Sequence, residues 1–425
     1  MNFRRALVAA AGELVLPGFK NRAAAFGAPA GDRLARFNFL LARARAALPA
    51  YDAACAAALG GRAGLSSFEE LPRLPAMSRE DAAGYTGGAL ARLESGGTGC
   101  AGRVETRLDL EAVVARYAGL LAVLKSAGWD MGDKVAALHP VEYGYFNNLQ
   151  GMLSAGQFGK AVFEFFQQYA LYRLVHNRKN VYYDHRIFSE PGAARRLASA
   201  AAAERPRLLI SRPDALMALL RSLRSPGGPV FRGLKAVLTV GTALGETVRR
   251  EARERLGAEV FNMYASTELG YAALSCPASG EWLHSDEERH LLEEGPGGSL
   301  LATDLDNKLA PLLRYQTGDA GELARRSCAC GRAGLQVRLK GRVKNFIETA
   351  SGRLYESELI DKAFPSDLPF FQLDTAAGGL LLPPGAGERE AARVREALAL
   401  PVGGYGLRAG ESFKISSSGK FCHIL

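Results

Sequence analysis

The chain has 425 residues, of which 48% are apolar and 23% are charged. This is an ordinary globular composition, and the chain is long enough for two or more domains. Its net charge of +9 either favours anionic ligands or reflects the surface arginines of an Ala/Gly/Arg-rich composition. No basic run is interleaved with aromatic residues and no stretch of about 18 uninterrupted apolar residues occurs, so we expect neither a nucleic-acid partner nor insertion into a membrane.

The N-terminal part, residues 1–90, reads as helices rich in Ala, Leu and Arg that are interrupted by prolines. The first residues resemble a signal peptide only superficially, because Glu13 interrupts a short apolar run. Six cysteines are too few to suggest a disulfide framework at this length, so we expect a cytoplasmic protein.

From Leu108 onward, helical patterns alternate with short apolar runs. Such alternation predicts an α/β fold in which sheets are flanked by helices. The expected strands are residues 134–138, 207–211 and 235–240, and the expected helices are 110–127, 245–256, 356–364 and 388–399. The acidic, then glycine-rich segment 286–299 is expected to be a loop. We place a large N-terminal domain at 1–340 and a small α+β domain at 341–425.

Three short segments carry residue types suited to a nucleotide. Ser95, Gly96, Gly97, Thr98 and Gly99 form a turn whose N–H groups could cradle phosphate; a linker is the alternative. In Tyr264-Ala265-Ser266-Thr267-Glu268 a carboxylate two residues after a hydroxyl suits Mg²⁺; the alternative is a strand end and a helix start capped by Thr267. Asp319, after a Thr-Gly turn, suits ribose hydroxyls; the alternative is an Asx-turn.

Two further elements complete an ordered set: Gly341-Arg342, and Gly419-Lys420 near the end of the chain. The set resembles the ANL superfamily of adenylate-forming enzymes, and within it the phenylacetate-CoA ligase-like branch. The resemblance implies a phosphate loop at 95–99, Tyr264 on adenine, Thr267 and Glu268 at Mg²⁺ and triphosphate, and Asp319 and Arg342 on ribose. It further implies that Lys420 is the catalytic lysine and that the small domain is mobile about a hinge at Lys344.

The sequence departs from the family pattern at several of these positions. Ala265 replaces a glycine, Gln316 replaces an arginine, and Ala101 stands where a proline is common in the phosphate loop. The hinge reads Gly341-Arg342-Val343-Lys344-Asn345, and a lysine also occupies such hinges in the family.

Cysteine and histidine residues form a second constellation. Cys276 and His284 are spaced as C-x7-H, and Cys328 and Cys330 as C-x-C. Three thiolates and one imidazole would make a closed, structural zinc site; buried thiols without metal are the alternative. The C-x-C followed by Gly-Arg resembles a loop of phenylacetate-CoA ligase-like proteins, some of which bind metal there, and this favours zinc.

Tyr143 and Tyr145 follow the strand-like run 134–138, where the family places an aromatic residue beside the acyl pocket. A packed aromatic cluster is the alternative for each. The segment 161–187, rich in Phe, Tyr and Arg, matches no family motif that we can place.

The resemblance implies an AMP-forming acid ligase. ATP and Mg²⁺ would activate an aryl or acyl carboxylic acid to an acyl-adenylate, and the acyl group would pass to a thiol, most simply CoA. One alternative transfers it to an amine or a carrier protein. A second is a zinc-stabilised nucleotide-binding protein without catalysis, although retention of Lys420 and Glu268 argues against it. The sequence leaves a homodimer open and does not name the acid.

Overall fold

The structure, a computed structural model, describes residues 3–28, 31–86, 88–94, 105–141, 145–154, 156, 158–242, 244–349, 352–365, 370–400, 404–408, 410–416 and 419–425. The chain folds into two compact units, each built from two stretches of sequence. The first comprises Met1–Gly128 and Met263–Arg338, and the second Trp129–Asn262 and Leu339–Leu425. The domain boundary expected near Gly341 stays a prediction.

The first unit begins with helices, as the sequence predicts. They are α1 (Phe3–Val15), α2 (Phe19–Ala24), α3 (Arg33–Ala47), α4 (Pro49–Leu59), the 3₁₀ helix η1 (Phe68–Arg73), α5 (Arg79–Ala83) and α6 (Leu110–Ser126). Asp32 caps α3, and Ser78 with Asp81 forms a capping box on α5. Buried faces of α3 and α4 share an apolar core with Leu312, Leu313 and Tyr315.

Strands make up the rest of this unit. They are the pair β1 (Ala91–Glu94) and β2 (Glu105–Leu108), then β7 (Glu259–Ser266), β8 (Gly270–Leu274), β9 (Trp282–Ser285), β10 (His290–Glu294), β11 (Ser299–Asp304), β12 (Tyr315–Ser327) and β13 (Ala333–Arg342), with the 3₁₀ turn η5 (Pro296–Gly298). The larger sheet has the order β10-β11-β12-β13-β9-β8-β7. The loop expected at 286–299 is wrong for residues 290–294, because buried His290, Leu291 and Leu292 pair with β11 as strand β10, whereas 286–289 and 295–298 lie outside the strands.

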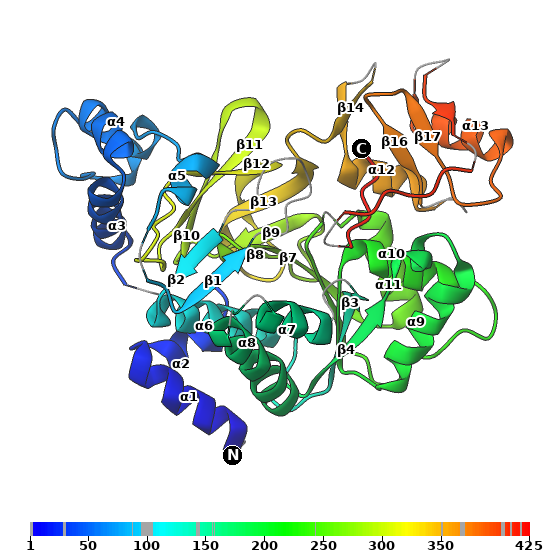
Figure 1. Cartoon of the computed structure of the whole chain (residues 1–425), viewed down its shortest axis with the longest axis horizontal. Helices are drawn as coiled ribbons and strands as arrows, with labels where there is room; N and C mark the ends of the chain where they lie inside the picture. Colours follow the sequence, from blue (N-terminus) through cyan, green and yellow to red (C-terminus); the bar gives the residue numbers. More distant parts are fainter. Residues whose placement is uncertain are drawn as a thin grey trace. The chain divides into compact units, whose positions relative to one another are not determined.

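The second unit contains a parallel sheet with the order β6-β5-β3-β4. Its strands are β3 (Val135–Pro140), β4 (Arg178–Tyr183), β5 (Leu208–Ser211) and β6 (Ala236–Val240). Its helices are α7 (Tyr145–Ser154), α8 (Phe158–Phe165), the wider π-type helix η3 (Phe166–Val175), the 3₁₀ helix η4 (His185–Phe188), α9 (Pro191–Ala203), α10 (Pro213–Ser222) and α11 (Glu246–Leu256). Helices α9, α10 and α11 lie side by side near β3 and β4 (Figure 1). The strands and helices expected between 134 and 256 are thereby confirmed.

The C-terminal stretch of the second unit contains β14 (Phe346–Thr349), β15 (Gly352–Tyr355), α12 (Glu356–Ala363), β16 (Gln372–Asp374), β17 (Gly379–Leu381), α13 (Glu388–Ala397) and β18 (Gly406–Leu407). It joins the core of the parallel sheet through Ile360, Phe364, Phe370 and Phe421. Asp361 of α12 also caps α11, because its carboxylate accepts hydrogen bonds from the N–H groups of Glu246 (3.0 Å) and Thr247 (2.8 Å). A helix start in one part of the unit is therefore completed by a side chain from another.

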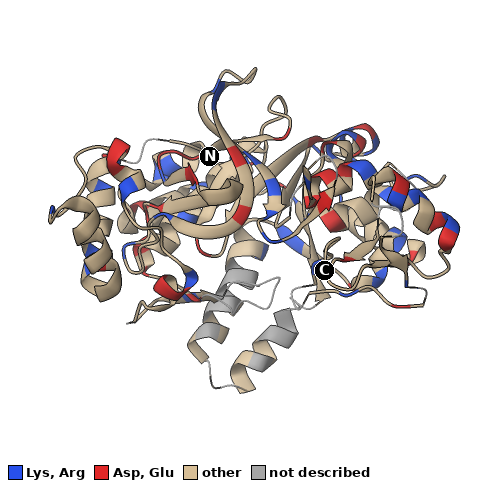
Figure 2. Cartoon of the chain, turned by 90° about the horizontal axis from the view of Figure 1, so that it is seen from above, with Lys and Arg blue, Asp and Glu red and all other residues tan. Residues whose placement is uncertain are grey.

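Basic and acidic residues are interspersed along the described helices and strands (Figure 2). None of the described helices combines the length and the apolar character that crossing a membrane requires.

Candidate active site

Three predicted nucleotide residues of the first unit, Tyr264, Thr267 and Glu268, lie on the hairpin that joins β7 to β8. Tyr264 is buried on β7, and residues 267–269 form the turn. The Leu269 N–H donates to the Ser266 hydroxyl at 3.1 Å, and Gly270, with φ of 74°, returns the chain to β8 in the left-handed conformation that favours glycine. A helix start capped by Thr267, the alternative raised by the sequence, is wrong, because a strand follows the turn.

Tyr264 and Asp319 are brought together from β7 and β12. The Tyr264 hydroxyl donates to Asp319 Oδ2 at 2.8 Å. The Asp319 N–H donates to the Thr317 hydroxyl (3.1 Å), which donates to the Leu300 carbonyl (2.9 Å), and Gly318 between them has a φ of 75°. The residues expected at adenine and at ribose thus share one hydrogen bond.

The backbone of the β7–β8 turn is held by Arg116 of α6. Arg116 Nη1 donates to the Thr267 carbonyl and Nη2 to the Glu268 carbonyl, each at 2.6 Å. His290 Nε2 lies 2.8 Å from the Leu269 carbonyl oxygen. Because a carbonyl oxygen can only accept, Nε2 of His290 must carry a proton to form this hydrogen bond. Three successive carbonyl groups of the turn are therefore fixed from other elements.

Glu268 is suited to a divalent cation. The residue is 6% exposed, and among the described residues its carboxylate has neither a hydrogen bond nor an ion pair. A carboxylate without such a partner, on a turn whose backbone is fixed, offers the oxygen ligand that Mg²⁺ prefers.

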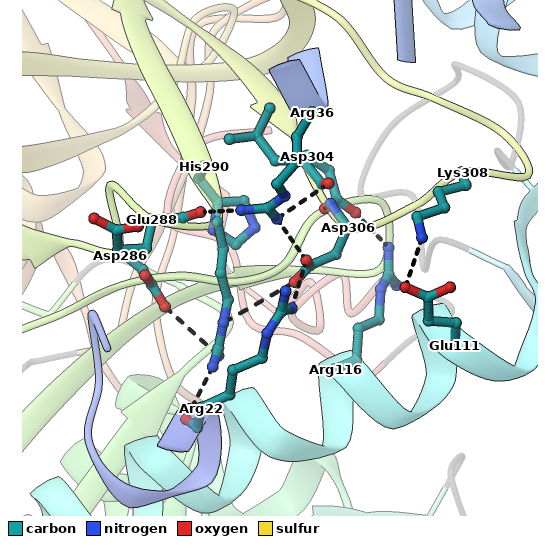
Figure 3. Close-up of polar contacts among 12 residues, drawn as sticks. Arg22, Arg36, Glu111, Arg116, Asp286, Glu288, His290, Asp304, Asp306 and Lys308 are labelled. Carbon is teal, nitrogen blue, oxygen red and sulfur yellow. Dashed lines mark hydrogen bonds and ion pairs between the residues drawn. The ribbon is translucent and has the colours of Figure 1, made fainter. Parts of the chain in front are cut away.

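A network of arginines and aspartates lies beside this turn (Figure 3). Asp306 Oδ1 accepts from Arg22 Nη1 and Arg36 Nη2, each at 2.7 Å. Burial raises the pKa of Asp306, but Arg22, Arg36 and Arg289 together outweigh burial and hold it below its ordinary value. Asp306 therefore remains ionised and binds α2 and α3 to the loop that follows β11.

The same network reaches Arg116. Arg116 Nη2 lies 3.4 Å from Asp304 Oδ2, and Arg289 Nη1 lies 3.6 Å from Asp286 Oδ2. Burial raises the pKa of Asp286, and Arg289 and His290 only partly oppose that shift. The turn that carries Glu268 is thus connected through Arg116 to the charged network of Figure 3.

Lys420 lies at the carboxyl ends of the parallel strands of the second unit. Its Nζ donates to the carbonyl of Gly241, directly after β6, at 3.1 Å. Burial lowers the pKa of the Lys420 ammonium group, and Arg212 and Arg342 lower it further. Ligands of open α/β sheets bind outside these strand ends. Arg342 ends β13, and Lys344 is exposed in the turn before β14.

Several predicted residues cannot be placed. The phosphate loop at 95–99 and Tyr143 lie outside the described residues. Tyr145 begins α7, but its side chain is not among those described. Their assignments stay predictions.

The structure brings the four predicted metal ligands together. Cys276 follows β8, His284 lies on β9, and Cys328 and Cys330 follow β12. Their ligand atoms all lie within 4.8 Å of one another, with Cys276 Sγ 3.6 Å from Cys328 Sγ and Cys330 Sγ 3.5 Å from His284 Nε2. A tetrahedral zinc ion with ordinary bond lengths would separate sulfurs by about 3.8 Å and sulfur from nitrogen by about 3.5 Å.

The pKa values of two of these ligands shift in the direction that suits a metal, whereas burial raises the pKa of the Cys328 thiol. Burial and Arg332 lower the pKa of His284, which favours the neutral imidazole. Burial raises the pKa of Cys276, but hydrogen bonds with Ser279 and the Ala278 backbone outweigh it, and the net shift is downward. A metal ligand must be a thiolate or a neutral imidazole, so this donor set fits zinc.

Sequence reasoning missed four residues that hold these elements in place. Arg116 and His290 bind carbonyl groups of the β7–β8 turn. Arg212 and Asp214 lie where β5 meets α10, and both contact the backbone beside Lys420. The position of Arg212-Pro213-Asp214, directly after a predicted strand, is the signal that could have found the second pair.

The comparisons with known proteins agree with this fold. No protein-family model matches the chain. Over an alignment of 194 residues, which covers 42% of the chain, the sequence is 26% identical to phenylacetate-coenzyme A ligase of Thermus thermophilus. The match spans 44% of that enzyme, less than half of its length.

Two solved structures extend the agreement in fold to most of the chain. 2-Hydroxyisobutyryl-CoA ligase in its postadenylation state, in complex with 2-HIB-AMP, has a TM-score of 0.65 at 15% identity, over 92% of this chain and 88% of its own. An anthranilate CoA ligase in complex with anthranoyl-AMP has a TM-score of 0.50 at 15% identity, over 78% of this chain and 65% of its own. The predicted α/β fold and the resemblance to adenylate-forming enzymes are confirmed.

Asp306 provides a test of the network in Figure 3. Asp306→Ala leaves the buried guanidinium groups of Arg22 and Arg36 without their carboxylate, so we expect the free energy of unfolding at pH 7 to fall by about 3–5 kcal/mol, as measured by urea denaturation. Because the folded-state pKa of Asp306 is lowered, its contribution is complete above about pH 4 and is lost as the pH falls through the lowered value.

The control for this measurement is Arg250→Ala, which removes an exposed ion pair with Glu254. Such pairs contribute little, so the unfolding curve should not move. An Asp306→Ala curve that also coincides with the wild type would show that the network does not support the fold.

Proposed function

We propose that this chain, which has the fold of the adenylate-forming enzymes, is an ATP-dependent ligase that converts a carboxylic acid to an acyl-adenylate and then to a thioester. The observation that carries the proposal is the position of Lys420. Although 179 residues separate it from Gly241 in the sequence, its ammonium group reaches the backbone at the end of β6. This is the edge of a parallel sheet at which ligands bind.

In the first step a carboxylate oxygen of the acid attacks the α-phosphorus of ATP. The bond between that phosphorus and the oxygen bridging to the β-phosphate breaks, and pyrophosphate leaves. Negative charge grows on phosphate oxygens during this step, so a fixed cation lowers the barrier. Lys420 would supply that cation, and Glu268 would hold Mg²⁺, whose charge would offset that of the triphosphate. Tyr264, Asp319 and Arg342 orient the adenosine.

In the second step a thiolate attacks the acyl carbonyl, and AMP leaves with the electrons of the broken acyl–phosphate bond. The two solved structures reported above are CoA ligases, and phenylacetate-coenzyme A ligase matches part of the sequence. These relatives support CoA as the thiol and a small aryl or acyl acid as the substrate. Transfer to an amine or a carrier protein is the alternative for this step only.

We also propose that Cys276, His284, Cys328 and Cys330 hold a structural zinc ion. All four positions of a tetrahedron are filled by protein ligands, so no position remains for a substrate. The ion would join the ends of β8 and β12 to β9. Its contribution is to stability, and we assign no catalytic step to it.

ATP–pyrophosphate exchange over a panel of aryl, aliphatic and amino acids tests the first step. We expect exchange with one class of acid, and a decrease of about 10²–10³-fold in Lys420→Ala. Because burial and two arginines disfavour the charge on Lys420, its removal should not lower the melting temperature. Lys414→Ala, which removes an exposed lysine of the same segment, is the matched control and should retain full exchange.

Three outcomes would count against these assignments. Absence of exchange in a protein that binds ATP would indicate a nucleotide-binding protein without catalysis. Exchange that survives Lys420→Ala would remove that residue from the mechanism. Exchange without formation of an acyl-CoA would favour the amine or carrier protein as acceptor.

Metal analysis by mass spectrometry tests the zinc site. We expect about one zinc ion per chain, and a lower melting temperature after chelation because the ion joins three strand ends. Cys330→Ser should lose the ion, whereas Cys55→Ala, which alters a buried cysteine of α4, should retain it. A purified wild type that is folded, metal-free and unaffected by added zinc would contradict the proposal.

A further inference from the structure

The backbone on both sides of Lys420 is bound by one pair of buried side chains. Arg212 Nη2 donates to the carbonyl of Gly419, the residue before Lys420. Asp214 Oδ2 accepts a hydrogen bond from the N–H of Phe421, the residue after it, at 3.1 Å. The two side chains also bind each other, with Arg212 Nε 3.1 Å from Asp214 Oδ1 and Nη2 2.6 Å from Oδ2.

This Arg212–Asp214 pair has a rigid base. Arg212 directly follows β5, Pro213 occupies the first turn of α10, and the Asp214 carboxylate also accepts from the Ala215 N–H at 2.7 Å. Both residues are buried, at 9% and 3% exposure. A bidentate Arg–carboxylate pair of this kind fixes direction as well as distance.

Two kinds of contact hold the C-terminal segment. Phe421 packs against Phe188 and Phe370, with ring centroids 5.0 and 5.2 Å away, which holds the segment against the core of the second unit. The Arg212–Asp214 pair fixes the two peptide groups that flank Lys420. The Lys420 side chain itself donates to the carbonyl of Gly241.

We propose that Arg212 and Asp214 are positioning residues for Lys420, which set the place of its ammonium group for the adenylation step. The inference rests on the proposed function and adds residues that act through Lys420 without contacting the substrate. A displacement of about 1 Å in a catalytic group can reduce a rate by about 10²-fold. The rate of adenylation should therefore depend on this pair more strongly than the stability of the fold does.

The main variant is Arg212→Met/Asp214→Leu. Removing both partners avoids leaving a single buried charge, which would destabilise the protein by itself. The matched control is Arg224→Met/Glu251→Leu. Arg224 pairs with Glu251 (2.9 and 2.7 Å) and donates to the Phe364 carbonyl of the same C-terminal stretch, so the chemistry is alike, but it flanks α12 and not Lys420.

Two measurements are made on each variant. Amide hydrogen exchange followed by mass spectrometry reports on peptides that cover residues 419–425 and does not depend on any activity. ATP–pyrophosphate exchange, with the acid selected from the panel, reports kcat and the KM for ATP. Arg212→Lys, which keeps the charge but not the paired N–H donors, provides the conservative variant.

We expect faster hydrogen exchange at 419–425 in the main variant, and a kcat about 10²-fold below the wild type with the KM for ATP little changed. Arg212→Lys should lie between the two, and the control variant should keep a kcat within about threefold of the wild type because Lys420 stays in place. Unchanged hydrogen exchange at 419–425, or an equal loss of kcat in the control, would overturn the proposal. If the main variant does not fold, the same comparison is made between Arg212→Lys and Arg224→Lys.

Failure of the proposed function remains distinguishable from failure of this inference. A wild type that shows no pyrophosphate exchange with any acid would refute the adenylation step. The hydrogen-exchange comparison would still decide whether the Arg212–Asp214 pair fixes the segment around Lys420.

Discussion

Guanidinium groups that donate to backbone carbonyls beside a functional side chain are the interaction on which the candidate site depends. Arg116 binds the carbonyls of Thr267 and Glu268, and Arg212 binds that of Gly419. In each unit the arginine fixes the backbone next to the proposed functional group, which is the Glu268 carboxylate in the first unit and the Lys420 ammonium group in the second. A planar fork with several N–H donors can do this, and a lysine ammonium cannot do so with the same directionality.

Burying these arginines requires compensating carboxylates. An unpaired buried charge is strongly destabilising. Asp304 lies near Arg116 in the first unit, and Asp214 forms an ion pair with Arg212 in the second. Asp306 serves Arg22 and Arg36 in the same way. Part of the arginine content of this basic sequence is therefore paired with carboxylates inside the protein. They support the fold and the site together, so their loss would affect both.

The sequence predicted the fold class and many of the elements, because strands such as 235–240 and helices such as 245–256 are encoded by local patterns. It failed within the loop expected at 286–299, where acidic neighbours hide the apolar pattern of β10. The order of motifs predicted Tyr264 and Asp319, and the structure joins them. Spacing within C-x7-H and C-x-C predicted a cluster that the structure brings together.

The supporting residues could not be predicted in this way. Arg116 and Thr267 are 151 residues apart, and Arg212 and Gly419 are 207 apart. A single sequence contains no local signal for pairs that only tertiary folding brings together. An arginine in a predicted helix reads as a surface residue, and only its burial and its carbonyl partners reveal its contribution. The carboxylates that neutralise its charge also cannot be identified from the sequence, because the pairing appears only in the folded structure.

The end of the chain shows why such pairs matter. Around Lys420 the described backbone forms isolated bridges, Ile415 with Phe421 and Leu373 with Ile424, instead of a continuous strand or helix. Hydrogen bonds within the segment hold the peptide groups of Lys420 locally, because its N–H donates to the Ser416 hydroxyl (2.9 Å) and its carbonyl accepts from the Ser416 N–H (3.1 Å). Contacts with the rest of the second unit are made by the aromatic rings around Phe421, which supply apolar burial without direction, and by Arg212 with Asp214, which supply direction.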